Sequence, residues 1–79
     1  MKYLEYTVIF EPQPEGGYTV LVPSLPGCIT EGDTLAEAKK NVREAIRLYC
    51  ESLVKDGEEL PTDIRKIPIR EKIRFAIED

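Results

Sequence analysis

Apolar and polar residues alternate in the first ten positions of the chain. The even-numbered residues Leu4, Tyr6, Val8 and Phe10 alternate with Glu5, Thr7 and Ile9. A period of two residues is typical of a β-strand with one buried face. We therefore predict a strand from about Lys2 to Phe10, with its even-numbered side chains facing the core.

Two further strands are predicted after this one. The stretch from Glu11 to Gly17 is polar and rich in proline and glycine, which favours a hairpin connection. The second strand, Tyr18 to Val22, is rich in β-forming residues and ends where Pro23 follows, because proline cannot donate to a sheet. A short third strand is predicted near Cys28 to Glu31.

Turn and capping residues are concentrated between the second strand and the next element. Thr34-x-x-Glu37 has the spacing of a capping box, in which the threonine hydroxyl accepts from the Glu37 amide and the glutamate carboxylate reaches back. We interpret six residues first as structural turn and helix-cap residues: Pro26, Gly27, Gly32, Asp33, Thr34 and Glu37. A rigid turn can also present a surface to a partner, so both roles can hold for the same residues.

A long amphipathic helix is predicted from Thr34 to Asp56, with Gly57 as its stop. Its apolar side chains recur at helical spacing and lie within one arc: Leu35, Ala38, Val42, Ala45, Ile46, Tyr49 and Leu53. Leu48 points away from that arc. Glu44 and Arg47 have the spacing of an ion pair on the polar side.

The last part of the chain returns to an extended pattern. Pro68 interrupts Ile64, Ile67 and Ile69, which predicts a connector. Ile73, Phe75 and Ile77 then alternate with polar residues, which predicts a strand. The result is a single α+β domain over residues 1–79, with the order β-β-β-α-β in two layers and the last strand parallel to the first and beside it.

Charge and composition narrow the classes of function. The net charge of −4 disfavours a nucleic-acid footprint and suits a basic protein partner. No run of apolar residues is long enough for a transmembrane helix, and no signal-peptide core follows Met1, so we expect a cytoplasmic protein with no membrane partner. Two cysteines without any histidine disfavour a structural zinc site within one chain and exclude a Cys–His nucleophile.

The size of the domain favours self-association, because a chain of 79 residues builds only a small core. We expect a homodimer or higher homo-oligomer. The candidate contact residues are Ile73, Phe75 and Ile77 of the last strand, with Leu48 a weaker candidate.

Several motifs resemble the HicB-like antitoxin family over about residues 3–61. They are Tyr3-Leu-Glu-Tyr6, Gly17-Tyr18-Thr-Val, Pro23-x-Leu25-Pro26-Gly27-Cys28, Thr30-x-Gly32-Asp33-Thr34 and Glu37-Ala38-x-x-Asn41. The resemblance implies a partial ribonuclease H-like fold and binding to HicA, a small basic RNA-cleaving toxin. Full-length family members often carry a C-terminal DNA-binding domain, whereas this chain ends at Asp79, so we expect a short form without that domain.

We expect this chain to act by binding rather than by catalysis, without a cofactor or a metal. A ribonuclease H-type site needs several carboxylates around two metal ions, and Glu5, Glu37 and Glu44 are poorly placed for it. Tyr3 and Tyr18 could serve an RNA-binding sheet, but the acidic balance favours a role in the core. Candidate contacts to a basic toxin are Glu11, Glu15 and Asp33.

Two other functions remain open from the sequence. One is a stand-alone nucleic-acid-binding regulator, which would gather its basic residues on one face: Arg65, Lys66, Arg70, Lys72 and Arg74. The other is an orphan HicB-like oligomer without a toxin partner.

Overall fold

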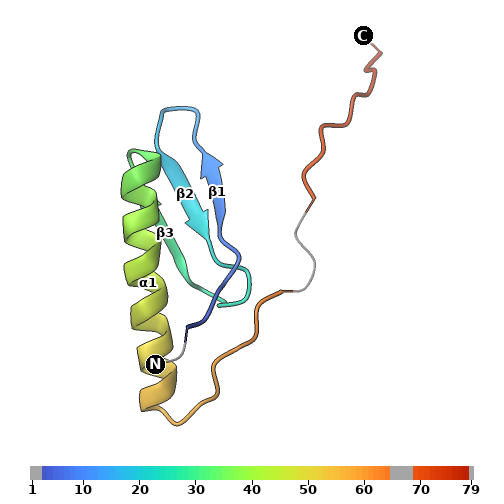
Figure 1. The fold of residues 1–79 in the computed structure, drawn as a ribbon. Helices are drawn as coiled ribbons and strands as arrows, with labels where there is room; N and C mark the ends of the chain where they lie inside the picture. Colours follow the sequence, from blue (N-terminus) through green and yellow to red (C-terminus); the bar gives the residue numbers. More distant parts are fainter. Residues whose placement is uncertain (1–2, 65–68, 79) are drawn as a thin grey trace.

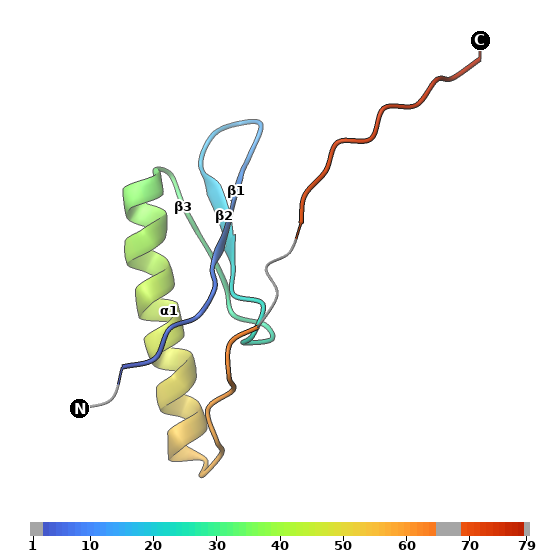
Figure 2. The same cartoon turned by 45° about the vertical axis from the view of Figure 1, so that its right-hand side comes forward.

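The fold is a three-stranded antiparallel sheet with one helix against it (Figure 1). A computed structural model describes residues 3–64 and 69–78. The strands are β1 (Ile9–Pro12), β2 (Tyr18–Leu21) and β3 (Ile29–Gly32), in the spatial order β1-β2-β3, and the helix is α1 (Leu35–Lys55). α1 packs mainly on β3 and less on β2, and Figure 2 shows β3 beside the helix. The predicted α+β class and the order β-β-β-α are confirmed.

The core lies between the sheet and α1. Its buried residues are Val20, Val22, Leu25, Cys28, Ala38 and Val42. Leu25 belongs to a loop, yet it is fully buried, because the chain from Val22 to Cys28 closes on itself through three backbone hydrogen bonds. Complete burial of a leucine or valine side chain stabilises the folded state by about 1.5–3 kcal/mol, so this loop contributes to the core as a strand would.

The contact between β3 and α1 requires a glycine. A Cβ atom on Gly32 would lie 2.4 Å from the backbone nitrogen of Ala38, which is closer than any real Cβ contact. One helical turn further on, the Asn41 side chain donates a hydrogen bond of 2.7 Å to the carbonyl oxygen of Glu31. The end of β3 and the first turns of the helix are therefore held at backbone contact.

Both ends of the helix agree with the sequence prediction. The Thr34 hydroxyl accepts a hydrogen bond of 3.1 Å from the Glu37 amide, and the Glu37 carboxylate accepts one of 3.4 Å from the Asp33 amide. After α1, Gly57 adopts φ +75° and the Gly57 and Glu58 amides bond back to carbonyls of the last turn. This Schellman pattern needs a left-handed residue, which glycine adopts without strain.

The predicted apolar arc of the helix is confirmed from Ala38 to Tyr49. Ala38 and Val42 are buried, and Ala45, Ile46 and Tyr49 pack against them. Leu35 was expected in the core but is 41% exposed, because it lies in the first turn, beyond the edge of the short sheet. Leu48 points outward, as predicted, and is 54% exposed.

Residues 58–64 turn back from the helix and are anchored beside the start of β1. The Tyr6 hydroxyl donates to the carbonyl oxygen of Pro61 at 2.6 Å. The Asp63 carboxylate accepts from the Thr7 amide at 2.9 Å, from the Thr7 hydroxyl at 2.7 Å and from the Ser24 hydroxyl at 2.9 Å. These hydrogen bonds hold the pKa of Asp63 below its usual value, and the bond from the Thr7 amide makes the largest contribution. The sequence did not reveal this anchor.

The first strand is shorter than predicted. It begins at Ile9, because β2 has only four residues and each strand residue needs a partner across the sheet. Lys2, the predicted first residue of this strand, lies outside the described residues. Tyr6, Val8 and Phe10 do pack against the core, as the alternation predicted, whereas Leu4 is 46% exposed. β3 occupies Ile29–Gly32, one residue later than expected.

The predicted last strand is not formed within residues 69–78. This segment is extended and projects away from the sheet and the helix in both views (Figures 1 and 2). The alternation of Ile73, Phe75 and Ile77 is that of a strand, but a strand also requires a hydrogen-bonded neighbour. Described residues 69–78 have no such neighbour in a single copy of the chain, so the parallel pairing beside β1 was wrong for this structure.

The close approach at Gly32 predicts a large effect of a small substitution. Gly32→Ala places a methyl group against the backbone of α1 and should lower the free energy of unfolding by about 1–3 kcal/mol. Urea unfolding followed by circular dichroism measures the loss. Ser52→Ala, on the exposed side of α1, is the control and should change stability by less than about 0.5 kcal/mol. Equal stability of the Gly32→Ala variant and the wild type would contradict the proposed packing.

The Asp63 anchor predicts a dependence of stability on pH. Because the folded-state pKa of Asp63 is lowered, its carboxylate stabilises the fold above the ordinary aspartate pKa of 3.8, and this contribution is lost as the pH falls below that value. Asp63→Asn should therefore unfold at lower urea concentration at neutral pH, and the difference from wild type should shrink in acid. Ser24→Ala removes one hydrogen bond to Asp63 but keeps the bonds from Thr7 to Asp63. This variant should therefore retain most of the loss of stability that the wild type shows in acid. Parallel stability–pH curves for the wild type and Asp63→Asn would rule the anchor out.

Candidate functional site

One face of the sheet has no helix on it. The strand register places Phe10, Val20 and Thr30 opposite one another, and Val20 is fully buried under α1. The alternate residues point to the other side, because successive side chains of a strand face opposite ways. They form two rows across the strands: Ile9, Leu21 and Ile29 in one, and Glu11, Thr19 and Glu31 in the other. We call these six residues the open sheet face.

The open sheet face combines apolar and acidic groups. Ile29 is 61% exposed and Leu21 is half-buried beside it. Glu11 and Glu31 flank Thr19 and are two strand spacings apart, about 10 Å. A cationic side chain between them would interact with both carboxylates, and apolar side chains of the same partner could cover the isoleucine row.

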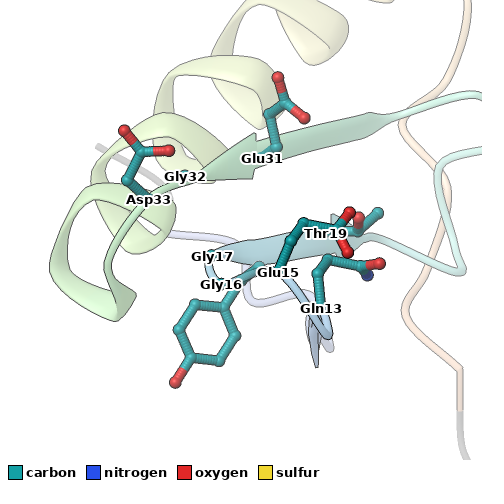
Figure 3. A pocket seen from close by; sticks show the side chains of 9 residues that line it. Gln13, Glu15, Gly16, Gly17, Thr19, Glu31, Gly32 and Asp33 are labelled. Atoms are coloured by element: carbon teal, nitrogen blue, oxygen red, sulfur yellow. The ribbon is translucent and has the colours of Figure 1, made fainter.

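A shallow pocket of about 230 Å³ lies at the end of the sheet where the hairpin turn meets the end of β3 (Figure 3). Glu15, Glu31 and Asp33 are among its lining residues. Figure 3 shows that the carboxylates of Glu31 and Asp33 point to different sides, away from Glu15. Within the described ranges 3–64 and 69–78, no group of three or more potential ligands could hold a metal ion.

The acidic residues expected to contact a partner are thus brought near one end of the sheet, but not into one cluster. Glu15 and Asp33 line the pocket, whereas Glu11 lies on the open sheet face. Glu31, which the sequence analysis did not select, belongs to both. The register of β3 places Glu31 opposite Thr19 and Ile29 opposite Leu21. The sequence does not show this register, so it could not identify Glu31 as a candidate contact.

The six turn and cap residues are at opposite ends of β3. Gly32, Asp33, Thr34 and Glu37 are at the start of the helix, and Pro26 and Gly27 are in the loop before β3. Gly27 adopts φ +82°, and the Tyr49 hydroxyl donates to the carbonyl oxygen of Pro26 at 2.9 Å. Each of the two groups therefore includes a residue with a structural contact.

The two cysteines are free thiols in the core region. Cys28 is buried, and burial raises the pKa of its thiol, which disfavours the reactive thiolate. Cys50 is half-buried on α1. These positions fit small apolar residues better than a nucleophile.

The outer face of α1 carries an ion-pair network. Arg47 bonds to Glu44, as predicted, and to Glu51 at 2.8 Å. These bonds, with Glu44 the larger contributor, raise the pKa of Arg47. Glu44 is therefore engaged on the solvent side of the helix, away from a position where it could join strand carboxylates.

The aromatic residues considered for RNA binding do not share an exposed sheet face. Tyr18 packs against the core on the helix side of β2, and Tyr3 lies outside the strands with 85% of its surface exposed. Stacking of successive bases requires aromatic rings on one exposed surface. Tyr3 and Tyr18 do not provide such a surface.

Residues 69–78 present two chemically different sides. Ile69, Ile73, Phe75 and Ile77 are 74–85% exposed. Arg70, Lys72 and Arg74 alternate with them, so an extended chain places the three cations on the other side. Arg65 and Lys66, also named for a nucleic-acid-binding alternative, lie outside the described residues.

Comparison with known proteins places the chain among antitoxins. Residues 6–74 match a family described as the HicB-like antitoxin of bacterial toxin–antitoxin systems. UPF0150 protein Ta0767 of Thermoplasma acidophilum is 52% identical over 60 residues, which cover 76% of this chain and 87% of the relative. The protein named antitoxin HicB of Escherichia coli K12 is 34% identical over 58 residues, 73% of this chain but 42% of that protein. Within the described residues, the helix is not apolar enough to cross a membrane.

Within the described residues, the Asp and Glu carboxylates are not gathered into a group that could hold a metal ion. We therefore predict that this chain does not cleave RNA with a metal ion. Purified protein incubated with RNA and Mg²⁺ or Mn²⁺ should leave the RNA intact, because two-metal catalysis requires carboxylates gathered on adjacent ions. Gel analysis of the RNA provides the measurement. Cleavage that disappears in Glu5→Gln or Glu44→Gln would overturn this expectation, and cleavage retained in both would point to a contaminating nuclease.

Proposed function

Because this chain belongs to the HicB-like antitoxin family, we propose that it binds and neutralises a small basic RNA-cleaving toxin of the HicA type. In this proposal it masks the active surface of the toxin. The toxin acts on RNA, so the complex forms in the cytoplasm.

The open sheet face is the surface that supports this proposal best. It presents an apolar row ending in exposed Ile29 and an acidic row ending in exposed Glu31. A protein interface commonly joins an apolar centre to a polar rim. Two carboxylates about 10 Å apart can each pair with a lysine or arginine of a cationic partner.

The charge of the whole chain supports the same choice of partner. A net charge of −4 attracts a cationic protein from a distance and raises the rate of association more than it raises affinity. We therefore place Glu11 and Glu31 at the contact, with Glu15 and Asp33 of the neighbouring pocket at its rim. Asp33 contributes its backbone amide to the turn before α1, a bond that a side-chain substitution leaves in place.

A second candidate is a nucleic-acid-binding regulator, favoured by the three cations Arg70, Lys72 and Arg74 on one side of an extended segment. It would bind DNA or RNA in a salt-sensitive manner without forming a complex with the toxin. The partial ribonuclease H-like fold implied by the family stays a prediction. Two further predictions also stay open: that the chain forms a homo-oligomer, and that it acts as an oligomer without a toxin partner.

Charge reversal on the open sheet face should weaken the toxin complex. We expect Glu31→Lys to slow association with a basic toxin of the HicA type, and to weaken binding about 10-fold at low salt. Ile29→Asp should weaken binding at least as much, because it places a charge in the apolar row. Surface plasmon resonance measures both effects, and co-expression tests rescue of growth.

Two matched variants control for charge and exposure. Glu58→Lys makes the same charge change on an exposed residue after α1, and Leu48→Asp makes the same kind of change on the outer face of the helix. Both should bind within about twofold of wild type. Equal loss in test and control variants would move the contact away from the open sheet face. Absence of any complex, together with salt-sensitive nucleic-acid binding, would support the second candidate instead.

A further inference from the structure

An apolar groove runs between β1 and the helix. α1 packs mainly on β3 and less on β2, which leaves the helix side of β1 only partly covered. The groove has a volume of about 540 Å³, with Val8 and Phe10 on one wall, Val42 and Ile46 on the other, and basic Lys39 and Arg43 at its rim. Phe10 is half-buried there, although it faces the core side of the sheet.

β1 is also an edge strand. The sheet order β1-β2-β3 places β2 on one side of β1 only, so its other edge has backbone groups able to accept a further strand. Addition of a strand at this edge would place alternate side chains of the new strand in the groove and on the open sheet face.

Residues 69–78 have the side-chain pattern that this position requires. One side of the extended segment carries Ile73, Phe75 and Ile77, which match the apolar groove. The other side carries Arg70, Lys72 and Arg74, which would lie beside the acidic row that begins at Glu11. Glu71 on the apolar side and Glu78 on the cationic side are exceptions to this pattern. The other named residues make both faces of the segment complementary to β1 and its surroundings.

We propose that residues 69–78 of one copy add as a fourth strand to the β1 edge of a second copy, and that the exchange is reciprocal. Within a single copy the segment points away from the sheet and the helix (Figures 1 and 2), and its apolar side chains are 74–85% exposed. The molecule is 58 Å long on its longest axis but only 27 and 19 Å on the others, so the segment extends well beyond its own domain. A two-fold axis uses each contact twice, which doubles the buried apolar surface.

The Asp63 anchor fixes where the exchanged segment leaves its own domain. Asp63 is bonded to Thr7 and Ser24, so the chain departs from the start of β1. The core of each copy is complete without residues 69–78, because all its buried residues lie between Val20 and Val42. Substitutions in the segment should therefore alter assembly without unfolding the domain. This inference does not depend on a toxin.

Light scattering tests the assembly. The full chain at tens of micromolar should have twice the mass of one 9.0 kDa chain. Phe75→Asp should raise the dissociation constant of the dimer by about 30-fold or more, with an unchanged helical signal in circular dichroism. Leu48→Asp, equally a charge on an exposed apolar residue, should remain dimeric. A monomeric full chain, or a Phe75→Asp variant that stays as dimeric as wild type, would overturn the proposal.

Cross-linking distinguishes exchange between copies from closure within one chain. Chains carrying Ile9→Cys are mixed with chains carrying Ala76→Cys, both with Cys50→Ala, and treated with a short bismaleimide. Ile9 and Ala76 would lie on the same face of the four-stranded sheet, so the mixture should give a cross-linked dimer that neither variant gives alone. Leu48→Cys mixed with Ala76→Cys should give none. Failure of the test mixture, or an internal link in a monomeric chain carrying both Ile9→Cys and Ala76→Cys, would refute exchange.

Discussion

The backbone contact between β3 and α1 is the constraint on which the rest of the structure depends. With Gly32 lying directly against Ala38, the helix is held over β3 and part of β2. A four-residue strand gives the helix little area to cover, so its position is set by this close approach and by the hydrogen bond from Asn41 to Glu31. The cap at Thr34 then starts the helix at the required place.

The position of the helix gives the two faces of the sheet different roles. Covering one face buries Val20 and the loop residue Leu25, the two largest fully buried side chains among the described residues. The other face is left with isoleucines and glutamates in adjacent rows. Because the helix is centred on β3, β1 is left partly uncovered on its inner side. A single packing contact thus determines both the candidate toxin surface and the candidate groove for a second copy.

The small size of the domain explains why its surfaces are so apolar. A chain of 79 residues with a core of six buried side chains among those described has little interior in which to place its remaining apolar residues. Ile29 remains exposed on the open sheet face, and Phe75 remains exposed beyond the domain. Apolar surface of this kind is commonly covered by protein partners.

The sequence alone determined the features that depend on neighbours along the chain. The helix from Leu35 to Lys55 follows from the spacing of its apolar residues, the cap at Thr34 and the stop at Gly57. The hairpin and the three antiparallel strands follow from local turn chemistry and alternation. The family resemblance rested on the same turn and cap motifs, because those residues are needed by the local geometry.

Tertiary structure decided every feature that needs a partner far away in the sequence. A strand pattern shows which side of a segment is apolar but not what the segment pairs with, so the first strand was predicted too long and the pattern of Ile73, Phe75 and Ile77 formed no strand within one copy. Glu31 and Ile29 became candidate contacts only when the register placed them beside β2. The bonds from Asp63 to Thr7 span 56 positions, and no local pattern encodes such a contact.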